Sequence, residues 1–435
     1  MSFPRYPKYK PSGVEWLGEV PEGWEVKPLR SVFKFSKGLT ITKENLQDEG
    51  VNCVNYGEIH SKYGFRLNPA IHPLRCVSPE YLSTNPEALI RDGDFVFADT
   101  SEDLEGSGNF THLRSDDPIF AGYHTIIARP RKDTCSLFLA YQIHSSVFRS
   151  QIQSQVKGVK VFSISQGILK GAKCWLPPLP EQTAIAEFLD RETGKIDGLV
   201  AEQRRLMELL KEKRQAVISH AVTKGLNPHA PMKPSGIEWL GDVPERWEVG
   251  PVKRYFKSCN TRRIPLSGEE RGGRSGVYPY YGASGIIDYI DEFIFDEDLV
   301  LVSEDGANLL NRASPIAFVA TGKYWVNNHA HILRPIDSNF VFWAARIESI
   351  DITPFVTGSA QPKFTSEALG ALIISAPPLE EQRVQIQNHI LAETAKFDAL
   401  TTEAQRVIDL LQERRTALIS AAVTGQIDVR QHTKN

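Results

Sequence analysis

Cysteine is scarce in this chain and follows no metal-binding or disulfide pattern. Cysteine occurs five times, an odd number, at Cys53, Cys76, Cys135, Cys174 and Cys259. The positions are widely separated and no Cys-x-x-Cys pair occurs, which argues against both a structural zinc site and a disulfide framework. The sequence therefore favours a reducing cytoplasm.

Long apolar segments are also missing. The N-terminus, MSFPRYPKYK, lacks the apolar core of a signal peptide, and no run approaches the roughly 18 apolar residues that a membrane span needs. A hydrophobic content of 41% and a charged content of 24% are those of an ordinary globular protein. At 435 residues the chain can form two or more domains, and we expect no membrane association.

An excess of positive charge is absent. The formal net charge is −3, residues 35–175 hold about as many acids as bases, and residues 258–375 hold more acids than bases. A protein that binds DNA by itself usually has a basic domain or patch. Any DNA affinity must therefore come from a few locally placed side chains, or from a partner that supplies phosphate contacts.

The common catalytic motifs are missing together. The segment nearest to a phosphate-binding loop, residues 321–324, ends in Tyr324 where Ser or Thr is required. No Asn-Pro-Pro-aromatic, Gly-x-Ser-x-Gly or His-Glu-x-x-His sequence occurs. Asp94 and Asp298 are interpreted as loop carboxylates, and His124 and His329, which recur at matching positions, as half-buried structural histidines. We expect no catalytic residue, no metal ligand and no enzymatic activity in this chain.

The chain contains an internal duplication. Residues 10–28 are KPSGVEWLGEVPEGWEVKP, and residues 233–251 are KPSGIEWLGDVPERWEVGP. A second pair follows, because PPLPEQ at 177–182 recurs as PPLEEQ at 377–382, and the match continues into the helices beyond. Chance does not produce matches of this length. The chain therefore consists of a head, a body and a tail, each present twice.

The two bodies, which lie between a head and a tail, are related only faintly. GDFVF at 93–97 resembles EDLVL at 297–301, and HTIIARP at 124–130 resembles HAHILRP at 329–335. Heads and tails are near copies, whereas the bodies share a skeleton and differ in detail. This contrast indicates one frame used twice to carry two different recognition modules.

The tails are predicted to be long helices. Residues 181–223 contain no proline and only two glycines. Their apolar residues form a narrow coiled-coil seam of Ile185, Leu189, Ile196, Leu199, Leu206, Leu210 and Val217 in the first copy, and Ile386, Ile390, Phe397, Leu400, Val407, Leu411 and Leu418 in the second. About 40 residues make a rod of roughly 60 Å. We expect the two rods to pair antiparallel about a pseudo-two-fold axis and to hold the bodies at opposite ends; the alternative is that each helix packs on its own body.

The bodies are predicted to be mixed α/β, which makes the whole chain α+β. Short strands are expected between turn residues at 95–97, 123–128, 299–302, 316–320 and 331–333. Helices are expected at 137–154 and 340–350, and the aromatic segment 278–286 is interpreted as a loop at a domain face.

Two heads, bodies and tails, with Pro-Pro-Leu-x-Glu-Gln at the start of each long helix, resemble the specificity subunits of type I restriction–modification systems. The resemblance covers nearly the whole chain and is carried by Trp16-Leu17-Gly18, Pro21 and Trp24, by their second copy, and by the helix entrances 176–182 and 377–382. It divides the chain into a first target recognition domain with its conserved segment (1–175), a first long helix (176–228), a second target recognition domain (229–375) and a second long helix with the C-terminal tail (376–435).

The resemblance also implies a function. Each body would recognise one half of a bipartite, asymmetric site in double-stranded DNA. The helices 181–223 and 381–424 would set the gap and bind two methyltransferase subunits, and restriction and translocase subunits would join the complex. S-adenosylmethionine, ATP and Mg are expected on those partners and no cofactor on this chain, in the cytoplasm of a bacterium or an archaeon.

Candidate DNA contacts are predicted from turn-rich and pre-strand segments. In the second body the expected base contacts are Tyr280, Tyr281, Ser284, Gln361 and Lys363. Arg262, Arg263 and Arg274 are interpreted as phosphate contacts or as ordinary surface. The first-body candidates are Lys157, Lys160 and Ser163 in the segment that matches 357–363, with Lys37 and Thr40 near the start of the body. Ordinary surface is the alternative for each of them, and Trp16, Trp24, Trp239 and Trp247 are interpreted as packing anchors.

Two other functions fit the same repeat. A two-armed regulator that binds DNA alone should show a basic face, which the composition does not suggest. A protein scaffold would use its two bodies to bind other proteins. Mixing the purified chain with a modification subunit distinguishes these functions from the restriction–modification interpretation.

Overall fold

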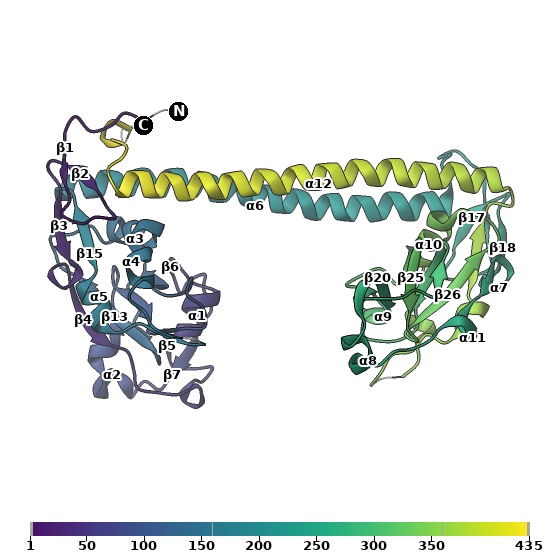
Figure 1. Cartoon of the computed structure of the whole chain (residues 1–435), viewed down its shortest axis with the longest axis horizontal. Coiled ribbons are helices and arrows are strands. Elements are labelled where there is room, and N and C mark those ends of the chain that lie inside the picture. Colours follow the sequence, from purple (N-terminus) through teal and green to yellow (C-terminus); the bar gives the residue numbers. More distant parts are fainter. Residues whose placement is uncertain (1–2, 159, 359, 433–435) are drawn as a thin grey trace. The chain divides into compact units, whose positions relative to one another are not determined.

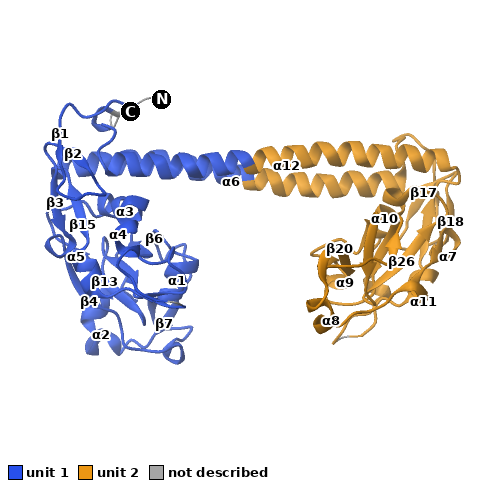
Figure 2. Ribbon diagram, in the orientation of Figure 1, with its two compact units in different colours: residues 1–203, 406–435 blue, residues 204–405 orange. Residues whose placement is uncertain are grey.

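The chain divides into two compact units. The computed structural model describes residues 3–158, 160–358 and 360–432. One unit comprises residues 1–203 and 406–435, and the other comprises residues 204–405 (Figure 2). Within the described residues no helix has the length and apolar character needed to cross a membrane.

The first unit contains two sheets around aromatic and aliphatic side chains. The larger sheet has the order β4 (Phe33–Lys37), β13 (Thr125–Pro130), β9 (Phe95–Ala98), β11 (Phe110–Leu113) and β6 (Arg66–Leu67). The smaller sheet has the order β7 (Arg75–Val77), β5 (Val51–Val54), β12 (Ile119–Ala121) and β8 (Leu89–Ile90). Strand β9 is a continuous apolar run buried on both faces, as expected for a central strand.

Shorter elements complete the first unit. The strand pairs are β1 (Tyr9–Pro11) with β2 (Glu19–Pro21), β3 (Glu25–Pro28) with β15 (Lys173–Leu176), and β10 (Thr100–Ser101) with β14 (Phe162–Ser163). The helices are α1 (Tyr56–Ser61), α2 (Tyr81–Thr84), α3 (Ser136–His144), α4 (Ser146–Gln153) and α5 (Gln166–Gly171). The single helix predicted over 137–154 is interrupted at Ser145, whose hydroxyl caps α4 by accepting from the Phe148 N–H at 3.3 Å.

The second unit also contains two main sheets, which differ from those of the first unit in their strands. One sheet has the order β19 (Phe256–Ser258), β26 (Ala330–Pro335), β23 (Leu299–Ser303) and β24 (Ala317–Ala320). The other has the order β21 (Gly285–Ile290), β20 (Ser275–Gly282), β25 (Lys323–Val326) and β22 (Phe295–Asp296). The aromatic segment 278–286 is therefore not a loop, as predicted, but most of the β20–β21 hairpin, with its turn at Ala283-Ser284.

The remaining elements of the second unit include two strand pairs and five short α-helices. The strand pairs are β16 (Met232–Pro234) with β17 (Asp242–Pro244), and β18 (Glu248–Pro251) with β27 (Ile373–Ala376). The helices are α7 (Val252–Tyr255), α8 (Gly268–Gly272), α9 (Asn308–Asn311), α10 (Phe340–Glu348) and α11 (Ser366–Ala371). Pairs β16–β17 and β18–β27 repeat β1–β2 and β3–β15, so the duplicated heads fold alike.

The duplicated tails form the two longest helices, α6 (Leu179–Lys224, 46 residues) and α12 (Glu380–Val423, 44 residues), labelled in Figure 1. In the first unit Arg415 Nε donates to Asp197 at 2.8 Å, and in the second unit Arg214 Nη1 donates to Asp398 at 2.6 Å. The same Asp–Arg pair of the repeat is therefore formed twice, with the helices antiparallel as predicted.

The seam between α6 and α12 differs from the predicted one. Leu199, Leu206 and Leu400 are exposed, whereas Val200, Ala404 and Ile408 are buried. Successive buried positions are four residues apart at places where the predicted seam advanced by three. A straight helix has 3.6 residues per turn, so its contact surface gradually departs from a pattern that repeats every seven residues. About half of the surface of each of these leucines is consequently exposed.

The tryptophans of the heads pack within their own units. Trp24 and Trp247 are buried, and Trp24 Nε1 donates to Glu181 of α6 at 2.9 Å. Trp16 and Trp239 are partly exposed and lie at the rim, where Trp16 packs on Trp175. These contacts confirm the packing role predicted for them.

In the second unit a buried ion pair attaches the start of α12 to the body. Arg383 Nε donates to Asp337 at 2.7 Å, with side chains only 7% and 4% exposed. Burial alone would raise the pKa of Asp337, but hydrogen bonds from the Asn339 N–H, Trp343 and Arg383 lower it below its usual value.

Replacing Asp337 by Asn should destabilise the second unit by about 3–5 kcal/mol, because Arg383 would remain buried without its counter-charge. The pKa of Asp337 is lower in the folded state than in the unfolded state. The ionised Asp337 therefore contributes its full stabilisation above the unfolded-state pKa, and this stabilisation is lost as the pH falls through the folded-state pKa. Urea unfolding at neutral and acidic pH measures both effects. Asp296→Asn, at an exposed ion pair, is the control and should change stability by less than about 0.5 kcal/mol. Equal stability of the two variants would contradict the prediction.

Candidate nucleic-acid interface

In the first body a loop is bonded to the end of the central strand. Strand β14 pairs with β10, which follows β9, and the Ile164 N–H donates to the Asp99 carbonyl at 2.7 Å. This pairing brings the described residues of the segment 157–163 next to the end of β9. The predicted contacts Lys157, Lys160 and Ser163 are all exposed on it.

The second body has a loop at the equivalent place. Thr357 and Lys363 exchange backbone hydrogen bonds of 2.8 and 2.7 Å, which close the loop 357–363. The Phe364 N–H donates to the Glu304 carbonyl at 2.8 Å, just after the central strand β23. Gln361 and Lys363 are exposed on this loop, as predicted for residues that contact DNA.

A hollow of about 680 Å³ lies beside the first loop. Lys37 and Thr40 line it together with Asp99, His124 and Ser165. The hollow thus holds the predicted residues at the start of the body, whereas the predicted loop residues Lys157, Lys160 and Ser163 are not part of its lining. No ion pair engages the first-body lysine candidates, or Lys363 in the second body, within the described parts of the chain.

The three arginine candidates of the second body are instead bound to carboxylates of the same body. Arg262 pairs with Glu297 at 2.5 Å and lies over the Phe295 ring. Arg274 pairs with Asp291 at 3.0 Å and Glu292 at 2.7 Å. Part of the hydrogen-bonding capacity of both arginines is therefore already used within the body.

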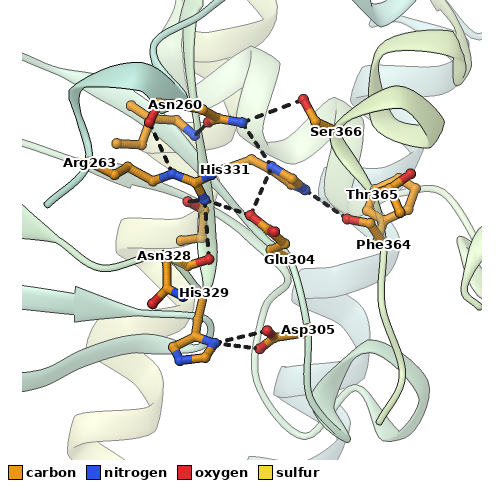
Figure 3. A network of polar contacts seen from close by, with 12 residues as sticks. Asn260, Arg263, Glu304, Asp305, Asn328, His329, His331, Phe364, Thr365 and Ser366 are labelled. Atoms are coloured by element: carbon orange, nitrogen blue, oxygen red, sulfur yellow. Dashed lines mark hydrogen bonds and ion pairs between the residues drawn. The ribbon is translucent and has the colours of Figure 1, made fainter. Parts of the chain in front are cut away.

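Arg263 belongs to a polar network that holds the second loop (Figure 3). Its Nη1 donates to Glu304 at 2.5 Å and to the Ala330 carbonyl at 2.9 Å. Burial lowers the pKa of His331, whose Nε2 lies 2.7 Å from the Phe364 carbonyl and donates to it. Because Arg263 is mostly buried here, its prediction as a phosphate contact is corrected to a role in supporting the loop.

The aromatic candidates are mainly structural. Tyr280 is fully buried and its hydroxyl accepts from the Leu266 N–H at 3.0 Å, so its prediction as a base contact is wrong for this conformation. Tyr281 is half-buried against Phe318 and Tyr324, and this burial raises its pKa. Ser284 is exposed at the turn of the β20–β21 hairpin and stays a candidate.

Each body also carries a histidine bound to an aspartate, exposed in the first body and half-buried in the second. His124 Nδ1 lies 3.1 Å from Asp99 Oδ1, and His329 Nδ1 lies 2.9 Å from both carboxylate oxygens of Asp305. The histidine side chains are 56% and 45% exposed. His124 is therefore more exposed than the half-buried residue that was predicted, whereas His329 is half-buried as predicted. Their recurrence in the sequence was the signal that pointed to them.

The structure defines a two-bodied α+β protein. In the part of the chain that it describes, no group of three or more His, Cys, Asp or Glu is placed to hold a metal ion. The model of the type I restriction modification DNA specificity domain matches residues 21–203 and again residues 244–408, which together make up most of the chain. The chain belongs to this family, whose members are the non-catalytic DNA-recognition components of type I restriction–modification complexes.

Individual relatives agree with the family assignment. The chain is 22% identical over 430 residues to a putative type I restriction enzyme MjaX specificity subunit of Methanocaldococcus jannaschii, covering 95% of this chain and 96% of the relative. It is 28% identical over 252 residues to the type I restriction enzyme EcoKI specificity subunit of Escherichia coli K12, covering 57% and 49% of the two chains. A solved structure from work on complex assembly and conformational transition of the type I R-M system has the same fold, with a TM-score of 0.62, 17% identity and coverage of 93% and 98%.

Proposed function

We propose that this chain binds a bipartite, asymmetric DNA sequence, with each body recognising one half and the two long helices setting the gap between the halves. The observation that carries the proposal is the contrast between near-identical heads and tails and two dissimilar bodies. One frame that presents two different surfaces suits an asymmetric target. Since its target is chromosomal or invading DNA, the protein would act in the cytoplasm.

The loops are the proposed recognition elements. Exposed lysine, serine, threonine and glutamine side chains can bond base edges in the major groove, where one bidentate contact discriminates by about 1–3 kcal/mol. The proposed contacts are Lys37, Thr40, Lys157, Lys160 and Ser163 in the first body, and Tyr281, Ser284, Gln361 and Lys363 in the second. Arg262 and Arg274 are proposed as phosphate contacts that use the rest of their hydrogen-bonding capacity.

The helices are the proposed docking sites for two methyltransferase subunits. The exposed leucines occupy equivalent places of the repeat, with Leu199 and Leu410 in the first unit and Leu209 and Leu400 in the second. Two equivalent apolar surfaces favour two copies of one partner. Restriction and translocase subunits would join this complex, and S-adenosylmethionine, ATP and Mg would bind to the partners.

The proposal assigns a role to each part of the chain. Residues 1–175 and 229–375 would be the two target recognition domains, each with its conserved head. Residues 176–228 and 376–435 would be the helical parts that separate the domains and bind partners.

Co-purification with the methyltransferase subunit tests the proposal. We expect a stable complex of one chain with two methyltransferases, which transfers methyl groups from S-adenosylmethionine to adenine in plasmid DNA. The methyltransferase alone should modify the plasmid far less. A chain that binds DNA tightly without the methyltransferase would favour a regulator, and a chain that binds proteins but supports no methylation would favour a scaffold.

Replacing Gln361 by Ala should change the recognition of one half-site only. Loss of one amide contact relaxes discrimination at one base pair by about 1–3 kcal/mol. The methylated motif, read by sequencing modified DNA, should become degenerate at one position in one half. Lys253→Ala, an exposed change on α7 of the same body, is the control and should leave the motif intact. An unchanged motif, or degeneracy in both halves, would contradict the assignment of Gln361.

A further inference from the structure

We infer that His124 and His329, each oriented by an aspartate, are phosphate contacts that position the two bodies on the DNA backbone. The inference rests on the proposed function and adds a distinct class of contact to it. These histidines are separate from the residues proposed to distinguish bases.

The two histidines occupy the same place in the fold. His124 immediately precedes β13, and its carbonyl accepts from the Asp99 N–H at 3.0 Å. His329 immediately precedes β26, and its carbonyl accepts from the Glu304 N–H at 2.9 Å. Each therefore lies at the end of the central strand pair, where the loop 157–163 or 357–363 is attached.

The carboxylate partners come from different positions of the skeleton. Asp99 is the backbone equivalent of Glu304, but Glu304 binds Arg263, and the partner of His329 is the next residue, Asp305. The Asp–His pair thus occurs in both bodies although the residue that supplies the carboxylate has moved. Duplication of an ancestral Asp–His pair would have left the aspartate at the equivalent position in both bodies. The observed pairs are better explained if both bodies require a histidine that is oriented by a carboxylate.

The pair leaves one imidazole nitrogen available. Nδ1 of each histidine is held by its aspartate, and no partner of Nε2 is found in either ring among the described residues. In Figure 3 the second nitrogen of the His329 ring is turned away from Asp305. An imidazole that donates to a carboxylate through Nδ1 and to a phosphate through Nε2 carries a positive charge, and both bonds are charge-assisted.

A phosphate explains why both bodies keep the histidine. Base contacts must differ between two bodies that recognise different sequences, whereas backbone contacts fix position and carry no sequence information. The surroundings agree, because His124 shares its hollow with Lys37, and His329 lies beside the segment that bonds to Lys363. Neither lysine is engaged in an ion pair in the described part of the chain.

The test uses the full-length chain in complex with its methyltransferase subunits and a mixed-sequence DNA duplex. His124→Asn and His329→Asn are suitable variants, since asparagine tolerates the left-handed backbone of His124, whose φ is 54°. Each should weaken binding by roughly tenfold and reduce the salt dependence of log K by about one, and the double variant should reduce it by about two. His229→Asn, at an exposed linker histidine, is the matched control.

Two further measurements separate a phosphate contact from other roles. His329→Lys should restore most of the affinity, because a cation replaces a cation, and the methylated motif should keep its sequence in every variant. Unchanged affinity and salt dependence in the double variant would overturn the inference, as would altered bases in one half of the motif. A wild-type complex that neither binds nor methylates DNA would instead overturn the proposed function.

Discussion

Removing residues 201–207 from α6 and 402–408 from α12 is expected to shorten the unread gap in the DNA target by about three base pairs. Seven residues correspond to about 10.5 Å of helix, and B-DNA rises about 3.4 Å per base pair. Seven residues are also nearly two full turns, so the seam of each helix resumes almost in register after the deletion. The two halves of the motif should keep their sequences.

The reciprocal change is the control for this prediction. Inserting seven residues at the same positions should lengthen the gap by the same amount. Sequencing of methylated DNA from cells that express each variant gives the gap directly. A gap that stays constant in both variants would mean that the helices do not set the spacing.

Replacing Leu199 and Leu410 by lysine is expected to remove one of the two methyltransferase subunits from the complex. Burying one leucine contributes about 1.5–3 kcal/mol, so losing two should weaken that docking site by roughly 100-fold or more. Replacing Leu209 and Leu400 should remove the other subunit, and the fourfold variant should bind neither. The helices should persist, because leucine and lysine have similar helix propensities.

The mass of the purified complex measures this effect. Leu226→Lys, at an exposed leucine outside the two helices, is the control and should leave both subunits bound. Complexes of unchanged mass in both double variants would show that the methyltransferases dock elsewhere.

The repeat and the main elements were predictable from the sequence because their signals are local. The segment 181–223 was predicted as a helix and α6 spans Leu179–Lys224, since proline ends the preceding strand and no later proline interrupts the helix. Strand β9, likewise, is a short apolar run between turn residues. The seam between the two long helices was less predictable. Leu199 and Val200 are both apolar, and which of them is buried depends on how the partner helix packs.

Residues of the candidate site could be predicted only where a turn-rich sequence indicated an exposed loop. The exposed positions of Lys157 and Gln361 agree with their turn-rich sequences. The ion pair of Arg262 with Glu297 and the burial of Tyr280 depend on contacts between residues distant in sequence. The aspartates that hold His124 and His329 were missed for the same reason, although the recurrence of both histidines was visible.

Methylome sequencing of the host with and without this gene tests the central claim most directly. The account predicts that one methylated motif disappears with the gene and that this motif consists of two unlike halves separated by unspecified bases. A methylome in which the lost motif is continuous, or in which no motif is lost while the methyltransferase is active, would contradict it.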